Sequence, residues 1–274
     1  MPDSHIDLSA EARRALMSGS IATLTSQLLT RGYRTTFIGG VQPLRPDVRM
    51  VGRAFTLRYA PSREDVGFRV DDDNSADVQR LAVERVGPGD VLVIDARGQT
   101  RAASFGHIIA TRIAKRGAAR LVTDGALRDT PAFRSLNLPV YCAGAHAVTS
   151  SVAHYAVDMQ VPIGCGEVLV MPGDIVVGDA EGVVVLPQSI AEEVATAASE
   201  QELVERYALE RVRECESIRG LYPLAEEQRT AFETWRRAHG DGDVVDAASR
   251  RPGLKHDAVQ ATPETPSDLS GPAG

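Results

Sequence analysis

Residues 121–130 read LVTDGALRDT, and this stretch decides how the sequence around it is interpreted. An apolar start leads into an Asp-Gly turn, and the oppositely charged neighbours Arg128 and Asp129 follow almost at once. A short apolar run bounded by a turn is typical of a buried strand. We therefore expect a strand that ends where a guanidinium and a carboxylate stand side by side.

The flanking segments extend this strand into a repeating unit. GPGDVLVIDA (87–96) is a turn followed by a continuous apolar run, as in a strand buried on both faces, and LPVYCAG (138–144) is a further strand. Thr130 is expected to cap a short helix that begins with Pro131. With a helix in 104–117, the order β-α-β-α-β predicts parallel strands with right-handed crossovers.

The helix expected in 104–117 has start and stop signals. Ser104 is the predicted N-cap, and Gly117 is the predicted stop after Lys115 and Arg116 in the last turn. Its apolar positions at helical spacing are Phe105, Ile108, Ile109 and Ile113.

A different pattern begins after residue 150. Short apolar runs separated by Gly-rich turns fill 161–187 and predict an antiparallel β module without helices. Ser189 and Glu192 form a predicted capping box for a long helix that ends near Gly220. Its apolar stripe is Ile190, Val194, Ala197, Val204, Ala208, Val212 and Cys215. Packing on a neighbouring subunit and packing on the chain's own core both remain open for this helix.

We expect residues 1–240 to form a single domain with helical extensions. Residues 241–274 carry several prolines among Ser, Thr, Asp and Gly, with no aromatic residue, and are expected to be a disordered tail. The fold class expected is α/β, with a βαβαβ core followed by the antiparallel module and the long C-terminal helix.

Composition excludes several classes of protein. The chain of 274 residues has a net charge of -7 and 5% aromatic residues, with no basic block, which argues against a nucleic-acid surface. No apolar run is long enough for a membrane span, so a cytoplasmic protein is expected. The 3 cysteines, Cys142, Cys165 and Cys215, lack the spacing of a disulfide framework or zinc site and are expected to be buried.

Arg128 and Asp129 share one site with the start of the helix in 104–117 if the strands that precede them are neighbours in the sheet. Unpaired N–H groups at the helix start, within 103–109, bind a carboxylate or phosphate well. Arg128 then holds the same anion through its guanidinium, and Asp129 offers a hard oxygen ligand to Mg²⁺ or Mn²⁺. The alternative is a local surface ion pair without chemistry. For His107 a surface position is favoured over a ligand contact.

A metal held by one carboxylate keeps open positions that suit a chelating 2-oxo acid. As a Lewis acid, it stabilises the enolate formed in retro-aldol cleavage or β-decarboxylation. The lysines, Lys115 in a helix end and Lys255 in the tail, make a Schiff-base aldolase a poor alternative.

Other candidate residues have weaker patterns. Asp124 is either an Asx-turn residue or functional, and Asp95 either a strand-end cap or functional. His146 and His154 have no diagnostic spacing to Cys142. The run DDDN (71–74) is either a solvated turn or an acidic loop for metal or substrate.

The segments GPGDVLVIDA, FGHIIATRIAKRGAARLVTDGALRD and PGDIVVGDAEGVVVLP together resemble the RraA-like family over roughly residues 15–220. That family includes aldolases for 4-hydroxy-4-methyl-2-oxoglutarate and 4-carboxy-4-hydroxy-2-oxoadipate, which also decarboxylate oxaloacetate. The resemblance implies a swivelling-domain-like α/β/β layered fold and a homotrimer or homohexamer with active sites near subunit boundaries.

The resemblance also implies site roles. The backbone of Gly106, His107, Ile108 and Ile109 would bind the pyruvyl portion of the substrate, Arg128 its carboxylate or keto oxygen, and Asp129 the divalent metal. Metal-bound water would carry the proton.

Two departures leave the substrate open. The aldolases carry glutamate and leucines where this chain has His107, Ile108 and Ile109. Residues 31–44 and 219–240 resemble a longer subgroup associated with sugar-acid catabolism, so a sugar-acid dehydratase is an alternative.

A ribonuclease regulator is another alternative function, although the regulators lack the aspartate after the arginine. A methyltransferase finds no support, because no G-x-G-x-x-G loop follows a strand. Substrate selection is expected from 33–40 or the DDDN run, contributed by a second subunit.

Overall fold

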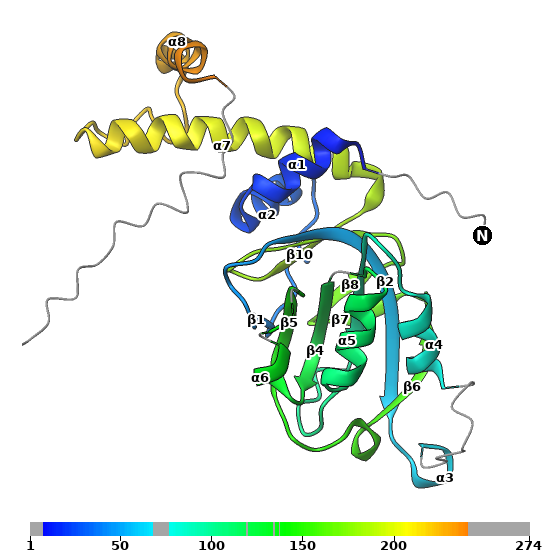
Figure 1. The fold of residues 1–274 in the computed structure, drawn as a ribbon. Coiled ribbons are helices and arrows are strands. Elements are labelled where there is room, and N and C mark those ends of the chain that lie inside the picture. Colours follow the sequence, from blue (N-terminus) through cyan, green and yellow to red (C-terminus); the bar gives the residue numbers. More distant parts are fainter. Residues whose placement is uncertain (1–7, 68–76, 119, 134, 137, 241–274) are drawn as a thin grey trace, which may run out of the picture. The chain divides into compact units, whose positions relative to one another are not determined.

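A computed structural model of the chain describes residues 8–67, 77–118, 120–133, 135–136 and 138–240 (Figure 1). Its centre is a curled, mixed β-sheet in the order β1-β5-β4-β3-β2-β9-β10, with β6 paired to β2. The strands of this sheet are β1 (Gln42–Pro43), β2 (Met50–Pro61), β3 (Asp90–Asp95), β4 (Arg120–Leu127), β5 (Val140–Ala145), β6 (His154–Met159), β9 (Ile175–Gly178) and β10 (Val183–Leu186).

The predicted β-α-β-α-β core is confirmed. β3, α5 (His107–Lys115), β4, α6 (Thr130–Phe133) and β5 follow in that order, and β3, β4 and β5 are parallel. The apolar runs are continuous because both faces of these strands are covered: alternate residues of β3 face two different hydrophobic clusters.

The longest strand, β2, was not predicted. It pairs in parallel with β3 and antiparallel with both β9 and β6, so it joins the parallel core to the antiparallel module. Gly52, Arg53 and Arg58 interrupt its apolar pattern. Arg53 lies 3.4 Å from the Asp90 carboxylate, and Arg58 lies 3.7 Å from that of Asp158.

Helices cover one face of the parallel strands. α4 (Val78–Arg85) and α5 pack there around a cluster that includes Phe105, Ala110 and Ile113. The N-cap of α5 is Gly106, so the prediction of Ser104 was wrong. Ser104 is fully buried and its N–H donates to the carbonyl of Ala126 over 2.7 Å, which holds it in sheet-like pairing with β4.

The other face carries the predicted antiparallel module. The hairpin of β7 (Ile163–Cys165) and β8 (Val168–Val170) packs on the sheet, while β9 and β10 join its edge. Between residues 161 and 187 the chain is free of helices, as expected.

A helical layer lies beyond β9 and β10. α1 (Ala10–Ser18) and α2 (Ile21–Thr30) lie between the sheet and the N-terminal half of α7 (Ala191–Arg213) (Figure 1). α7 therefore packs within the chain's own core. The predicted capping box is wrong, since Ser189 lies in the 3₁₀ turn η3 (Gln188–Ile190) and the Glu192 carboxylate accepts from the N–H and hydroxyl of Ser9.

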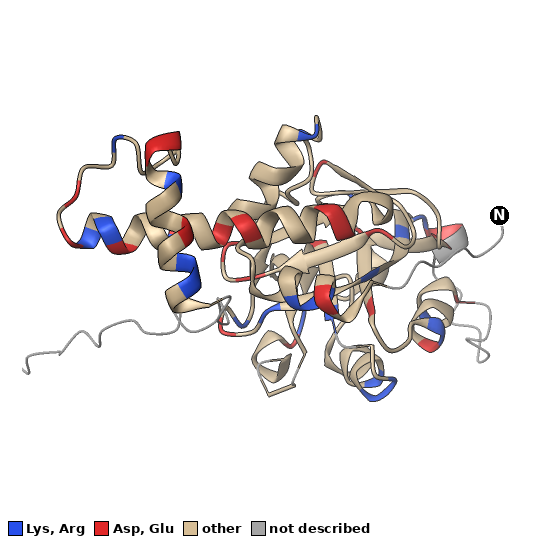
Figure 2. Ribbon diagram, turned by 90° about the horizontal axis from the view of Figure 1, so that it is seen from above, with Lys and Arg blue, Asp and Glu red and all other residues tan. Residues whose placement is uncertain are grey.

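The C-terminal half of α7 packs against α8 (Arg229–His239), which follows the 3₁₀ turn η4 (Glu226–Gln228). Tyr207, Phe232 and Trp235 form an aromatic cluster between the two helices. Along α7 the charged residues are acidic up to Glu205, and basic ones join them only toward its C-terminal end (Figure 2); Arg236 of α8 pairs with Glu200 at 2.8 Å. α7 ends at Arg213 and not near Gly220, which leaves the thiol of Cys215 exposed, contrary to expectation.

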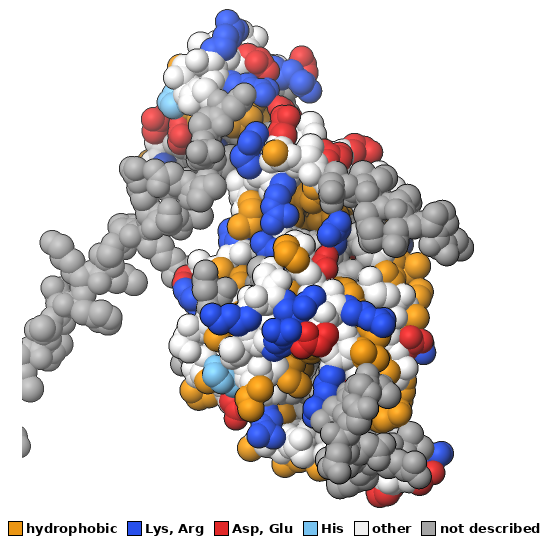
Figure 3. All heavy atoms as spheres, turned by 45° about the vertical axis from the view of Figure 1, so that its right-hand side comes forward, with side chains coloured by type: hydrophobic (Ala, Val, Ile, Leu, Met, Phe, Trp, Pro, Cys, Tyr) orange, Lys and Arg blue, Asp and Glu red, His pale blue; other side chains and the backbone are white. Residues whose placement is uncertain are grey.

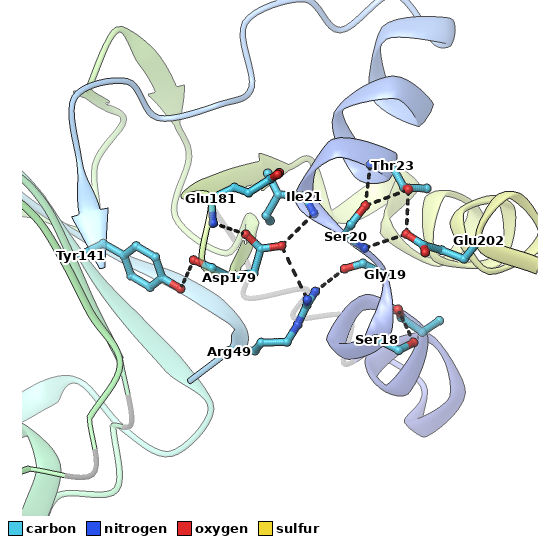
Figure 4. A network of polar contacts seen from close by, with 11 residues as sticks. Ser18, Gly19, Ser20, Ile21, Thr23, Arg49, Tyr141, Asp179, Glu181 and Glu202 are labelled. Atoms are coloured by element: carbon cyan, nitrogen blue, oxygen red, sulfur yellow. Dashed lines mark hydrogen bonds and ion pairs between the residues drawn. The ribbon is translucent and has the colours of Figure 1, made fainter. Parts of the chain in front are cut away.

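A polar network joins the helical layer to the sheet (Figure 4). The buried carboxylate of Asp179 accepts from the N–H groups of Ile21 (3.1 Å) and Glu181 (2.8 Å), and lies 3.5 Å from Arg49. The hydroxyl of Tyr141 donates to the carbonyl of Asp179 over 2.9 Å. The turn between β9 and β10 thus fixes the start of α2.

No described helix has both the length and the apolar character to cross a membrane. The short helices α3 (Glu64–Gly67) and η2 (Ser150–Val152) complete the described elements. The DDDN run and the predicted tail (241–274) lie outside the described residues, so the disorder of the tail and the domain limits stay predictions.

Candidate functional site

The charged pair and the start of α5 lie together, where β4 ends. Arg128 N–H donates to the carbonyl of Phe105 over 3.1 Å, which joins the end of β4 to the loop before α5. Asp129 has a left-handed backbone (φ 60°), a conformation uncommon for residues other than glycine and found often at functional sites. The chain then turns directly into α6.

The Asp129 carboxylate touches the helix start itself. Its Oδ2 accepts the N–H of His107 over 3.2 Å and lies 3.5 Å from Nε of Arg128. Both side chains are partly exposed, at 42% for Arg128 and 46% for Asp129. The local ion pair foreseen as the alternative is therefore present, but it sits against the first turn of α5.

Gly106 makes this close approach possible. A β carbon at residue 106 would lie 2.5 Å from Oδ2 of Asp129 and 2.9 Å from Cγ of Arg128, distances that real side chains do not adopt. The absence of a side chain at Gly106 therefore opens the space in which the carboxylate, the guanidinium and the helix start meet.

These residues line one pocket of about 220 Å³. The predicted site residues Gly106, His107, Ile108, Ile109, Arg128 and Asp129 all line it. The first N–H groups of a helix have no acceptor within the helix, so the start of α5 offers donors to an anion in this pocket. A pocket of this size suits a small metabolite, since drug-sized ligands occupy roughly 300–1,000 Å³.

The side chains on the first turn of α5 have different surroundings. The imidazole of His107 lies 3.3 Å from the hydroxyl of Thr111 and meets the ring of Phe133 edge-on. The side chain of Ile108 is 86% exposed, so its predicted place on the buried stripe of the helix is wrong. Both residues border the pocket.

The pocket is also lined by four residues that the sequence did not single out for the site: Gln79, Arg80, Thr149 and Ser150. They come from the first turn of α4 and the segment after β5. In the sequence these segments lie far from Arg128, and no local motif marks them. The range 33–40, expected to select the substrate from a second subunit, runs along β10 within its own chain, and its contribution to a neighbouring subunit stays a prediction.

The carboxylate of Asp129 fits a divalent cation that keeps most of its ligands as water or substrate. Within the described ranges no group of three or more His, Cys, Asp or Glu side chains could hold a metal. Mg²⁺ needs only one or two carboxylates when a substrate supplies further oxygens. Asp129 would hold it beside the space left by Gly106.

Asp124, although close to Arg128 in sequence, serves another part of the fold. Its carboxylate accepts the N–H groups of Ala96 (2.6 Å), Gly98 (2.8 Å) and Gly166 (3.4 Å), and so ties the end of β3 to the β7–β8 turn. Burial raises the pKa of Asp124, partly offset by these hydrogen bonds. With Asp95, Asp124 lines a different cavity of about 640 Å³.

Among the described residues, no hydrogen bond joins Cys142 to His146 or His154. His154 is buried, near the carbonyl of Ala102 (3.3 Å), and His146 accepts the N–H of Val148. Burial raises the pKa of the Cys142 thiol, which favours the unreactive protonated form.

The face seen in Figure 3 bears a group of basic side chains, in blue, among apolar ones in orange. The chain is acidic overall, with a net charge of -7. This face is therefore locally basic although the whole chain is acidic, and local positive charge is compatible with an anionic ligand.

The sequence matches a known family. The family model described as "RraA-like: Aldolase/RraA" matches residues 21–185, which is more than half of the chain. The chain belongs to the RraA-like family. The match covers the sheet and the Arg128 pocket but ends before α7 and α8.

The sequence identity between this RraA-like chain and two of its relatives is moderate. A protein of Halalkalibacterium halodurans named "Putative 4-hydroxy-4-methyl-2-oxoglutarate aldolase" is 34% identical over 168 residues, which is 61% of this chain and 74% of that protein. The protein DlpA of Legionella pneumophila is 30% identical over 154 residues, 56% of this chain but 24% of its own.

Solved structures confirm the fold class. The crystal structure of RraAS2 from Streptomyces coelicolor, described as an unusual member of the RNase ES inhibitor RraA protein family, is similar at a TM-score of 0.66 and 32% identity. The similarity covers 74% of this chain and 98% of RraAS2. An uncharacterised protein of Pseudomonas syringae, with a TM-score of 0.67 and 24% identity over 79% of this chain and 99% of its own, shares the fold.

Proposed function

We propose that this RraA-like protein is a divalent-metal-dependent lyase that cleaves a carbon–carbon bond in 2-oxo acids. The observation that carries the proposal is the contact of the Asp129 carboxylate with the first N–H of α5, in a pocket that Arg128 shares. The names of its aldolase relatives support the same reaction class.

The residues of the pocket have complementary roles toward a 2-oxo acid. The guanidinium of Arg128 binds its carboxylate or keto oxygen through charge-assisted hydrogen bonds, and the N–H groups at the start of α5 orient the pyruvyl portion. Asp129 holds Mg²⁺ or Mn²⁺. When bound, the metal acts as a Lewis acid for the developing enolate charge.

The bond changes balance without an external oxidant or reductant. In a 4-hydroxy-2-oxo acid, loss of the 4-hydroxyl proton lets the C3–C4 bond break, its electron pair forms pyruvate enolate, and a second carbonyl product leaves. In oxaloacetate the same bond breaks with release of CO₂. Protonation at C3 then gives pyruvate in both cases.

The pocket encloses these steps only in part, because both charged side chains remain partly exposed. The trimeric or hexameric assembly implied by the family therefore enters the proposal as a means of completing the site. Light scattering measures that assembly, and cell fractionation tests the expected cytoplasmic location.

The test is pyruvate release from oxaloacetate and from a panel of 4-hydroxy-2-oxo acids, with and without chelator, for wild type and Asp129→Ala. Rates without enzyme are subtracted, because free metal ions decarboxylate oxaloacetate. The proposal expects activity that both chelator and substitution abolish. Activity insensitive to both would overturn the mechanism, dehydration of a sugar acid would favour the dehydratase, and ribonuclease binding without turnover would favour the regulator.

A further inference from the structure

The loop that leads into α5, residues 102–106, is held by side chains from other strands of the sheet. The hydroxyl of Tyr59 donates to the carbonyl of Ser104 over 3.2 Å. The imidazole Nε2 of His154 lies 3.3 Å from the carbonyl of Ala102. Histidine is the side chain whose usual pKa lies between about pH 5 and 8, so acid acts on the second of these two contacts.

The surroundings of His154 suit its neutral form. The residue is 5% exposed, and the carbonyl of Ala102 is an acceptor only, so Nε2 carries the hydrogen and donates it. Nδ1 is buried, and no described group forms a hydrogen bond with it. Protonation would add a second N–H that has no acceptor among the described residues, which is costly for a buried donor.

The charged groups around His154 also oppose its protonation. Burial lowers the pKa of this histidine; its hydrogen bond to the backbone raises the pKa, and the guanidinium groups of Arg97 and Arg101 lower it. Tyr59, whose ring centroid is 5.3 Å away, stays uncharged because burial raises its pKa. On α4, which packs against β6, Asp77 is occupied in capping that helix. A proton on His154 would therefore lie beside two arginines.

His154 also adjoins a second wall of the pocket. Thr149 and Ser150 line the pocket and lie shortly before β6, which begins at His154. The carbonyl of Val148 accepts the N–H of Ala103 over 2.9 Å, so the segment after β5 is joined to the loop before α5. Displacement of His154 therefore reaches both segments.

We propose that His154 is a positioning residue: its neutral imidazole holds residues 102–106 in the conformation that presents the start of α5 to an anion, and protonation releases them. Only the identity of the anion, a 2-oxo acid, rests on the proposed function. Because the pKa of His154 is lower in the folded protein than in the unfolded chain, the contact stabilises the fold above about pH 6.5 and is lost as the pH falls.

The first test measures amide hydrogen exchange in peptides that cover residues 98–106, corrected for the intrinsic pH dependence of exchange, at about pH 7.5 and about pH 5. The proteins are wild type, His154→Gln, His154→Leu and, as a control on α8, His239→Gln. Glutamine keeps an N–H that can donate to Ala102 but takes up no proton, whereas leucine loses the contact. Melting temperatures check that each variant folds.

Corrected exchange in wild type and in His239→Gln is expected to rise roughly tenfold between the two pH values, and that in His154→Gln to change by less than about twofold. His154→Leu should exchange fast at both. An equal pH response in wild type and His154→Gln would overturn the proposal, as would slow exchange in His154→Leu at both pH values.

The second test measures Kd for 2-oxobutyrate by calorimetry with Mg²⁺ at the same two pH values. The Kd of wild type should rise by roughly tenfold more on acidification than that of His154→Gln, since other groups titrate alike in both proteins. Equal changes in the two proteins would overturn the link between His154 and the anion site. Binding by wild type at neither pH would overturn the proposed function, while hydrogen exchange would still decide whether His154 holds the loop.

Discussion

The N–H of His107 donates to the carboxylate of Asp129 over 3.2 Å, so the start of α5 and the end of β4 meet at one carboxylate. This contact joins segments from two successive units of the parallel sheet. It places a carboxylate, a guanidinium and the start of α5 at one pocket. Loss of any of these groups has a separate, measurable consequence.

Arg128→Gln should raise KM for the 2-oxo acid by about tenfold or more, because a charge-assisted hydrogen bond contributes about 1.5–3 kcal/mol. Arg128→Lys should recover only part of the affinity, since lysine lacks the forked geometry. Steady-state kinetics on oxaloacetate measures both variants. Unchanged KM in Arg128→Gln would remove this residue from substrate binding.

Gly106→Ala should lower activity by about ten- to a hundredfold, because a displacement of about 1 Å in a catalytic group has effects of this size. The added methyl group would meet the Asp129 carboxylate at 2.5 Å. Gly144→Ala is the matched control, since a β carbon there meets nothing within 4 Å. The account expects wild-type activity in the control, and equal activity in both variants would show that the close approach at Gly106 is unimportant.

The parallel core was predictable because its signals are local. The strand in 87–96 carries a continuous apolar run, and the strand in 120–127 begins with the apolar pair Leu121 and Val122; burial on both faces favours such residues. β2 escaped prediction because Gly52 and two arginines break its pattern, and their charges are satisfied only by partners distant in sequence.

Ser104 shows the limit of cap signals. Its residue type and position favoured a helix start, but pairing with Ala126 moved the start to His107. The charged pair was recognisable from the DGALRD motif, although the predicted Asp-Gly turn is wrong, because Asp124 and Gly125 lie within β4 at a shift in its pairing with β5. Arg80 was not, because only the packing of α4 against the loop before α5 brings it to the pocket, and that packing is not encoded by any local motif.

Asp179→Ala should lower the free energy of unfolding by about 2–4 kcal/mol, because it leaves the N–H of Ile21 and the charge of Arg49 without their carboxylate. Tyr141→Phe removes one neutral hydrogen bond of the same network and should cost only about 1 kcal/mol. Urea unfolding measures both values. Neither residue lines the Arg128 pocket, so activity per folded molecule should stay unchanged. Equal stability of wild type and Asp179→Ala would show that this network does not secure the helical layer.

Asp174 gives a pH dependence of stability. Burial raises its pKa to about 6, partly offset by hydrogen bonds from the N–H groups of Met171 and Gln188. Because the folded pKa lies above the unfolded value, the contribution of this group is complete below about pH 4 and is lost as pH rises through about 6.

Asp174→Asn removes this titration. Its stability relative to wild type should therefore rise between about pH 4 and 7, by on the order of 2–3 kcal/mol. Urea unfolding of both proteins across this range measures the difference. A difference that stays constant with pH would show that the carboxyl group ionises normally in the folded protein.

The most direct test of the account is Mn²⁺ binding, followed by electron paramagnetic resonance of the free ion, in wild type and Asp129→Asn, with and without pyruvate. Asparagine keeps the shape of aspartate but loses its charge. The account predicts that wild type binds Mn²⁺, more tightly with pyruvate present, and that Asp129→Asn weakens this binding by at least about tenfold. Equal Mn²⁺ affinity in the two proteins, with no effect of pyruvate, would contradict it.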